Sequence, residues 1–202
     1  VFALSMLESG RKVILRTAAS IVPVLAGINK KPLLDSGYFN QTSGTGVLAV
    51  VGSYVPKTTA QLDKLQTIPD IHFIEIKVDK VIDMGLNLAN KMVTQIDGLI
   101  AKKQDVVLFT SRKLIADHDP ETSLMIGQKV SAFITAIVQL LKIQPKAILA
   151  KGGITSSDVA TKGLGVKKAL VAGQVAAGVP VWKLGDETKF PGLNYIVFPG
   201  NV

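Results

Sequence analysis

Cysteine is absent from the 202-residue sequence. Its absence excludes disulfide bonds and thiolate metal sites, and it fits a reducing, cytoplasmic location. Aromatic residues are also scarce, at 5%, although 48% of the chain is hydrophobic. The core must therefore consist mainly of Val, Ile, Leu and Ala, which is the mixture typical of parallel strands covered by helices.

Long apolar runs are missing as well. No uninterrupted apolar run is long enough to cross a bilayer. The chain starts at Val1, and the residues that follow do not resemble a signal peptide because no basic leader precedes the apolar ones. We therefore expect no membrane partner, and we interpret the sequence as part of a longer protein.

Acidic residues are outnumbered, with 15 Asp and Glu against 23 Lys and Arg, so the formal net charge is +8. Such a balance favours either nucleic acid or an anionic small molecule as a partner, or simply a solvated basic face. The lysines are scattered, are not interleaved with aromatic residues, and accompany no nucleic-acid-binding motif. We therefore predict that nucleic acid is not a partner.

Apolar runs alternate with segments of helical period, which is the pattern of an α/β fold. The expected strands are 46–51, 71–78, 105–110, 147–150, 166–172, 179–184 and 195–198, and the expected main helices are 56–66, 79–102 and 123–141. A short strand at 12–15 and a helix at 18–27 precede them. This order predicts a Rossmann-like three-layer domain with a central, mostly parallel sheet.

The sharpest local signal is the run from Ala147 to Asp158, in which an apolar strand leads into Gly152-Gly153 and then into Ile154-Thr155-Ser156. Glycines let the backbone turn tightly and approach a ligand, and the helix start supplies unpaired N–H groups that favour an anion. The run is not a Walker A loop, because no Gly-Lys-Ser/Thr follows the glycines. It predicts either a phosphate cradle or an ordinary strand-to-helix turn.

Two further strands end in similar turns. One strand ends at Gly52-Ser53 ahead of a helix opened by Pro56, and the last one ends at Phe198-Pro199-Gly200-Asn201. Because ligands of open α/β sheets bind beyond the carboxyl ends of strands, such loops on neighbouring strands would line one crevice. Each of them has the simpler interpretation of a capped or terminal turn.

The other polar arrangements are weaker. Arg16 and the hydroxyls near it could hold a carboxylate or phosphate, or they could cap a helix. His118 lies between Asp117 and Asp119, but the polar loop around them favours a solvated turn, so we predict no metal ligand. No Ser-His-Asp pattern or nucleophile elbow is visible, so the catalytic residues stay unassigned.

Taken together, several stretches resemble the nucleotide-binding half of the four-carbon acid sugar kinases, which include the 3-oxotetronate and threonate kinases. The matching stretches are 52–59, 151–158, 173–175, 178–182, 190–192 and 197–202. Residues 16–20 resemble the segment that closes the family's N-terminal, sugar-acid-binding domain. The resemblance covers nearly the whole chain in the right order, although members of the family are longer.

The resemblance implies a domain order and a set of ligands. Residues 1–28 would end the N-terminal domain, 29–45 would be a linker, and 46–202 would form the nucleotide-binding domain. ATP would contact Ser53, the loop of Gly152, Gly153, Ile154 and Thr155, and Gly200, with Mg²⁺ at its phosphates. Arg16 would contact the four-carbon sugar acid, and the rest of the N-terminal domain, with a catalytic base, would lie outside this chain.

Two other functions stay open on the residues alone. The first is a non-catalytic α/β module that binds a phosphorylated metabolite. The second is an isomerase or aldolase acting on similar acids, although no cluster of carboxylates or lysines supports it. A homodimer and a monomer are equally compatible with the sequence.

Overall fold

The computed structural model describes residues 2–17, 20–29, 31–40, 45–53, 55–111 and 120–200, without the side chains of 82–84, 86, 120 and 121. The chain divides into two compact units, 1–32 and 33–202. The first contains two short helices, α1 (Phe2–Glu8) and α2 (Ile21–Leu25). Residues 11–17 form neither helix nor strand, so the expected strand at 12–15 is wrong. A strand needs a neighbour for its backbone hydrogen bonds, and Ile14 is instead 100% exposed.

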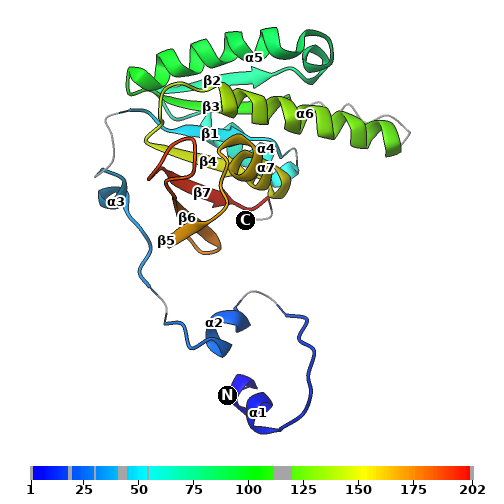
Figure 1. Cartoon of the computed structure of the whole chain (residues 1–202), viewed down its shortest axis with the longest axis vertical. Coiled ribbons are helices and arrows are strands. Elements are labelled where there is room, and N and C mark those ends of the chain that lie inside the picture. The colour runs from blue at the N-terminus through cyan, green and yellow to red at the C-terminus, as the bar shows by residue number, and fades with distance from the viewer. Residues whose placement is uncertain are drawn as a thin grey trace. The chain divides into compact units, whose positions relative to one another are not determined.

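The second unit is built on one seven-stranded sheet (Figure 1). Its strands are β1 (Leu48–Val51), β2 (Ile71–Ile76), β3 (Asp105–Thr110), β4 (Ala147–Lys151), β5 (Ala169–Ala176), β6 (Val179–Leu184) and β7 (Asn194–Phe198). The order is β2-β3-β1-β4-β7-β6-β5. Neighbours from β2 to β7 pair in parallel, whereas β6 and β5 are antiparallel to their neighbours.

Helices cover both faces of the sheet. They are α3 (Ser36–Asn40), α4 (Pro56–Leu65), α5 (Val78–Ala101), α6 (Pro120–Leu140) and α7 (Gly153–Asp158), which continues into a π-helical turn, η1 (Val159–Gly163). In β1, Leu48 and Val50 join the core beneath α5, α6 and η1, while Val51 packs against Leu62 of α4 on the other face. The predicted α/β, three-layer and mostly parallel architecture is therefore confirmed (Figure 1).

Residues 33–40 cover part of the sheet rather than crossing open solvent. Leu34, Tyr38 and Phe39 pack on a buried cluster formed by β4, β6 and β7. The Leu34 N–H donates to the Gln174 carbonyl of β5 at 2.8 Å. This packing places α3 with the second unit, while the proposed boundaries at 28 and 45 stay predictions.

The solvent exposure of helix α6 differs between its two ends. Ile134, Ile137 and Val138 near its end lie in the core, while Leu124 and Met125 near its start are exposed. Among the described residues, its stretch Thr122–Leu140 is long and apolar enough to cross a membrane by length and composition. Core helices meet the same criteria, and the end of α6 forms part of the core here.

Strands β1 and β4 lie side by side, and the chain leaves them in opposite directions. From β1 it passes through α4, on one face, to β2; from β4 it passes through α7 and η1, on the other face, to β5. This is a topological switch point, where the connections diverge and open a crevice beyond the carboxyl ends of the strands. The fold thus places a ligand crevice between the ends of β1 and β4.

Candidate functional site

The loops after β1, β4 and β7 meet at this crevice. The Gly152 N–H donates to the Phe198 carbonyl at 3.0 Å, which joins the ends of β4 and β7. A methyl group added to Gly52 would lie 2.1 Å from Thr155 Oγ1, so the β1 loop touches the start of α7. Three predicted loops are therefore brought together by the sheet.

Gly152 is needed for this close approach. Its φ is 117°, which residues with side chains rarely adopt. An added Cβ would lie 3.1 Å from Ser53 Cβ, and one added to Gly200 would lie 3.7 Å from Ser53 Oγ. Ser53, Gly152 and Gly200 thus line one narrow space.

Gly153 and Ile154 differ from Gly152 because they face open space. A Cβ on Gly153 would meet nothing within 4 Å, and Ile154 is 74% exposed. Both lie in the first turn of α7, where N–H groups have no partners within the helix. Their N–H groups are thus suited to hydrogen bonds with an anion in the crevice.

Hydroxyl groups hold the loops in place. The Thr58 hydroxyl, buried in α4, donates to Ser53 Oγ at 3.3 Å. The Ser156 hydroxyl donates to the Gly152 carbonyl, and the buried Tyr195 hydroxyl of β7 donates to the Ser156 carbonyl at 2.7 Å. Burial raises the pKa of Tyr195, so this donor keeps its proton. These bonds fix the start of α7 on β7.

Lys151 adds positive charge at the end of β4. It is only 5% exposed, and its ammonium donates to the Pro199 carbonyl at 3.1 Å and lies 4.0 Å from the Phe198 ring centroid. Burial lowers the pKa of Lys151, and the nearby charge of Lys57 lowers it further. Two cations therefore lie near the loops and favour an anion there.

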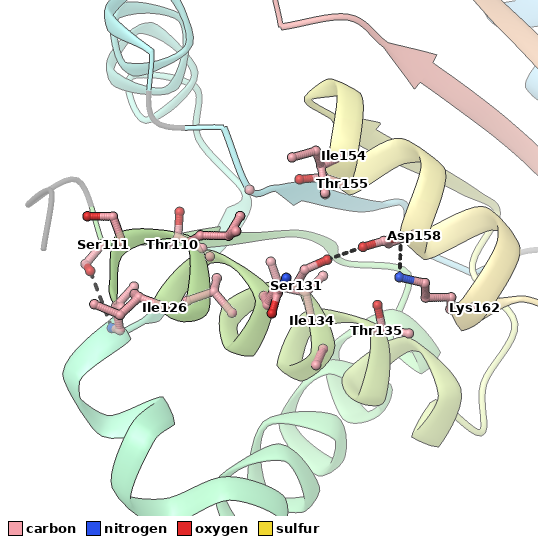
Figure 2. Close-up of a pocket in the computed structure, with 18 of the residues that line it drawn as sticks. Thr110, Ser111, Ile126, Ser131, Ile134, Thr135, Ile154, Thr155, Asp158 and Lys162 are labelled. Atoms are coloured by element: carbon pink, nitrogen blue, oxygen red, sulfur yellow. Dashed lines mark hydrogen bonds and ion pairs between the residues drawn. The ribbon is translucent and has the colours of Figure 1, made fainter. Parts of the chain in front are cut away.

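A cavity of about 870 Å³ adjoins the crevice, between α6 and α7 (Figure 2). Gly52 and Thr155 belong to its lining, and so do Thr110 and Ser111 at the end of β3. Inside it, Asp158 of α7 forms an ion pair with Lys162 at 2.8 Å and accepts a hydrogen bond from the Ser131 hydroxyl of α6. These two partners hold the pKa of Asp158 below its usual range.

The remaining candidates of the sequence lie outside the described part of the second unit. Arg16 is exposed in the irregular stretch of the first unit. His118 and its two aspartates lie outside the described residues. Sequence reasoning missed Lys151, Thr58 and the cavity. A charged residue ending the apolar run Ala147–Ala150 was the one available signal for Lys151.

The chain was compared with known protein families, curated sequences and solved structures. The family model for the nucleotide-binding C-terminal domain matches residues 48–202. No protein among the curated sequences matches the chain significantly.

Solved structures share the fold. A protein from Salmonella typhimurium LT2, provisionally named a tRNA synthase, is 14% identical with a TM-score of 0.61, over 80% of this chain and 39% of that one. A DUF1537 domain from Bordetella bronchiseptica, a domain-swapped dimer with bound citrate, is 16% identical with a TM-score of 0.60, over 81% and 39%. A DUF1537 protein from Haemophilus influenzae is 17% identical with a TM-score of 0.59, over 79% and 38%.

The chain therefore spans about two fifths of the length of these solved proteins. The family match covers more than half of the chain and contains every loop of the crevice. The chain belongs to the nucleotide-binding C-terminal domain family, which confirms its resemblance to the corresponding half of the four-carbon acid sugar kinases.

Proposed function

We propose that the crevice binds the phosphates of ATP with Mg²⁺, and that the complete protein phosphorylates a four-carbon sugar acid such as 3-oxotetronate or threonate. The observation that carries this proposal is the meeting of Ser53, Gly152 and Gly200 beyond the ends of β1, β4 and β7. Ligands of open α/β sheets bind at this place. Family membership supports a nucleotide as the ligand.

The reaction would transfer the γ-phosphoryl group. A hydroxyl oxygen of the sugar acid bonds to the γ-phosphorus, the bond from that phosphorus to the β–γ bridging oxygen breaks, and ADP leaves. The hydroxyl proton passes to a base that lies in the rest of the protein. Such transfer depends mainly on positioning and on neutralising phosphate charge. N–H groups of Gly153 and Ile154 with the charges of Lys57 and Lys151 would do both here.

Mg²⁺ would be held mainly by the nucleotide. Within the described part of the chain, no cluster of three or more His, Asp or Glu residues could form a metal site. Mg²⁺ commonly binds substrate phosphates and waters with only one or two carboxylates. The acceptor's carboxylate would be bound partly by Arg16, as its guanidinium chemistry allows.

A homodimer and a cytoplasmic location belong to the same proposal. The Bordetella relative supports a dimer, and the lack of cysteine supports a reducing compartment. Light scattering of the purified chain and cell fractionation test these two points. A monomer at every concentration tested, or a secreted product, would contradict them.

The main test is calorimetry of ATP-Mg binding to the wild type and to Gly153→Asp. The carboxylate would repel phosphate at the start of α7, so we expect affinity to fall at least about tenfold, or ~1.4 kcal/mol. The thermal midpoint Tm should hold, because Gly153 has no positive φ and its added Cβ meets no atom within 4 Å.

Two controls separate charge from bulk and from general effects. Gly153→Asn adds similar bulk without charge and should weaken binding less than Gly153→Asp. Gly98→Asp places the same charge on α5, where an added Cβ also meets nothing within 4 Å, and should leave binding unchanged. Unchanged affinity in Gly153→Asp would refute the phosphate site. Binding of sugar phosphates without ATP binding would favour the non-catalytic module instead.

A further inference from the structure

The seven-stranded sheet has two edge strands, β2 and β5 (Figure 1). An edge strand presents backbone N–H and C=O groups that can pair with another chain, and proteins usually block such pairing with charges, bulges or covering segments. Among the residues of β2, Glu75 alone is exposed, and it is charged. In β5, by contrast, Leu170 and Val171 are 69% and 61% exposed. The β5 edge is therefore the less protected of the two.

The second half of β5 is already covered or irregular. The Leu34 N–H donates to the Gln174 carbonyl at 2.8 Å, and a Cβ added to Gly173 would lie 3.0 Å from the Leu34 side chain. The register of β5 against β6 also shifts twice, after Val171 and after Gln174. Such bulges discourage the pairing of a further strand. The open part of the edge is thus the first half of β5, which carries both exposed apolar side chains.

Positive charge surrounds this open half. Lys167 and Lys168 directly precede β5, and Lys183 of β6 pairs with Leu170, so these two side chains share one face of the sheet. All three lysines are exposed, and none of them forms an ion pair with another described residue. The Glu187 carboxylate accepts from the N–H groups of Lys167 and Lys168 at 3.4 and 3.2 Å and offsets part of the charge. The surface is therefore apolar with a net positive border.

We propose that the first half of β5 binds an extended, acidic segment of another protein, which pairs with it as an additional strand. In this mode of recognition, backbone hydrogen bonds supply affinity and alternate side chains supply specificity. Apolar side chains of the segment would cover Leu170 and Val171, and its carboxylates would reach the lysines. Strands β6 and β7 separate β5 from β4, so this surface lies apart from the glycine loop and goes beyond the proposed function.

A second copy of the chain fits this edge less well. In a two-fold pairing of β5 with β5, carboxylates opposite the lysines would have to come from β5 itself, and Ala169–Ala176 contains no acidic residue. Each copy also carries a net charge of +8. The open stretch is short, whereas stable interfaces between proteins bury about 1,200 Å² or more. Charge complementarity therefore favours an acidic partner.

The test uses a capped synthetic peptide of alternating glutamate and valine, with its lysine–valine counterpart as the control for charge. Trp182 is the only tryptophan of the chain and pairs with Val171, so its fluorescence reports on the neighbouring edge. We expect a saturable change with the glutamate peptide, with a Kd of about 1 mM or tighter. Added salt should weaken this binding, because it screens the exposed charges. The lysine peptide should give no change.

Variants locate the binding surface. Leu170→Lys places a charge on the open edge and should weaken binding of the glutamate peptide at least about tenfold. Ile68→Lys, at another exposed apolar position that lies outside β5, is the matched control and should bind like the wild type. Lys183→Glu should weaken binding roughly threefold. The replaced side chains are exposed, so the Tm of each variant should stay close to that of the wild type.

Four outcomes would overturn the inference. The first is a glutamate peptide that does not bind, or that binds Leu170→Lys as tightly as the wild type. The second is equal binding of the lysine peptide, which would remove the preference for acidic segments. The third is a dimer that Leu170→Lys abolishes and added salt strengthens, which would make a second copy the occupant. The fourth is a complete protein that fails to bind the peptide, since the rest of the protein would then cover the edge. None of these results depends on ATP-Mg binding.

Discussion

The loops after β1 and β4 have the same pattern in the sequence, a buried strand followed by glycine and a helix, yet they differ in the structure. After β1, Gly52 and Ser53 precede α4, which starts at Pro56 and covers one face of the sheet. After β4, Gly152 leads directly into α7, which lies with η1 on the other face. The β4 loop thus passes from Gly152 directly into its helix, whereas two residues separate Ser53 from the start of α4.

The glycines of the two loops consequently have different roles. Gly52 and Gly152 have no room for a side chain, because each lies against the other loop. Gly153 has room, and it faces the space where we place the phosphates. The two glycines without room for a side chain, Gly52 and Gly152, are therefore the ones that let the loops pack together. Gly153, which has room, is the one available to a ligand. Two predictions test this distinction, and two more test the charged groups beside the loops; they follow from the largest expected effect to the smallest.

Gly152→Val should destabilise the domain most, by about 3 kcal/mol. The valine would have to adopt a φ of 117° and crowd Ser53, whose Cβ lies 3.1 Å from the added Cβ. Urea unfolding followed by circular dichroism would measure the loss. Gly153→Val, one residue later, is the control and should lose much less. Equal losses at the two positions would contradict the distinction.

Gly52→Ala should cost about 2 kcal/mol through overpacking, since its methyl group would lie 2.1 Å from Thr155 Oγ1. The same unfolding assay applies. Because the crowding comes from a single side chain, adding Thr155→Ala should recover part of the loss. A double variant no more stable than Gly52→Ala would show that the two loops do not press on each other.

Lys151→Met should weaken ATP-Mg binding about tenfold, or ~1.4 kcal/mol, because it removes a cation near the crevice. Burial lowers the pKa of Lys151, so keeping it charged is unfavourable at pH 7, and this penalty is relieved as pH rises through the lowered pKa. The wild type should therefore gain stability relative to Lys151→Met between pH 7 and pH 10. Calorimetry and Tm measurements over this range would check both effects; an unchanged affinity would exclude Lys151 from the site.

Asp158→Asn should have the smallest effect on stability, below about 1 kcal/mol. Its partners lower the pKa of Asp158 in the folded state. The stabilisation is therefore present above the unfolded pKa of 3.8 and is lost as pH falls through the folded value. The Tm difference between wild type and variant should shrink from pH 6 to pH 2.5. A constant difference would mean that ionisation of Asp158 does not contribute.

Most elements of the second unit could be predicted from the sequence. The helices at 56–66 and 79–102 and the strands at 71–78 and 105–110 match α4, α5, β2 and β3 closely, because their apolar spacing records which side is buried. Apolar spacing was not enough to decide whether residues 12–15 form a strand, because the segment is too short to show a period. A short segment that contains β-branched residues, here Val13 and Ile14, becomes a strand only when a neighbouring strand pairs with it.

The candidate site likewise has some features that the sequence predicts and others that only the tertiary structure shows. Local chain chemistry is enough to show that glycine turns follow three strands, because turns, caps and strand ends depend on neighbouring residues. Strand order is a long-range property, and it alone decided that β1, β4 and β7 are adjacent and that their loops share a crevice. The buried ammonium of Lys151, the contact of Gly52 with Thr155 and the cavity at Asp158 likewise join residues far apart in the chain. They exist because packing brings these elements together, and no spacing within a single segment records that.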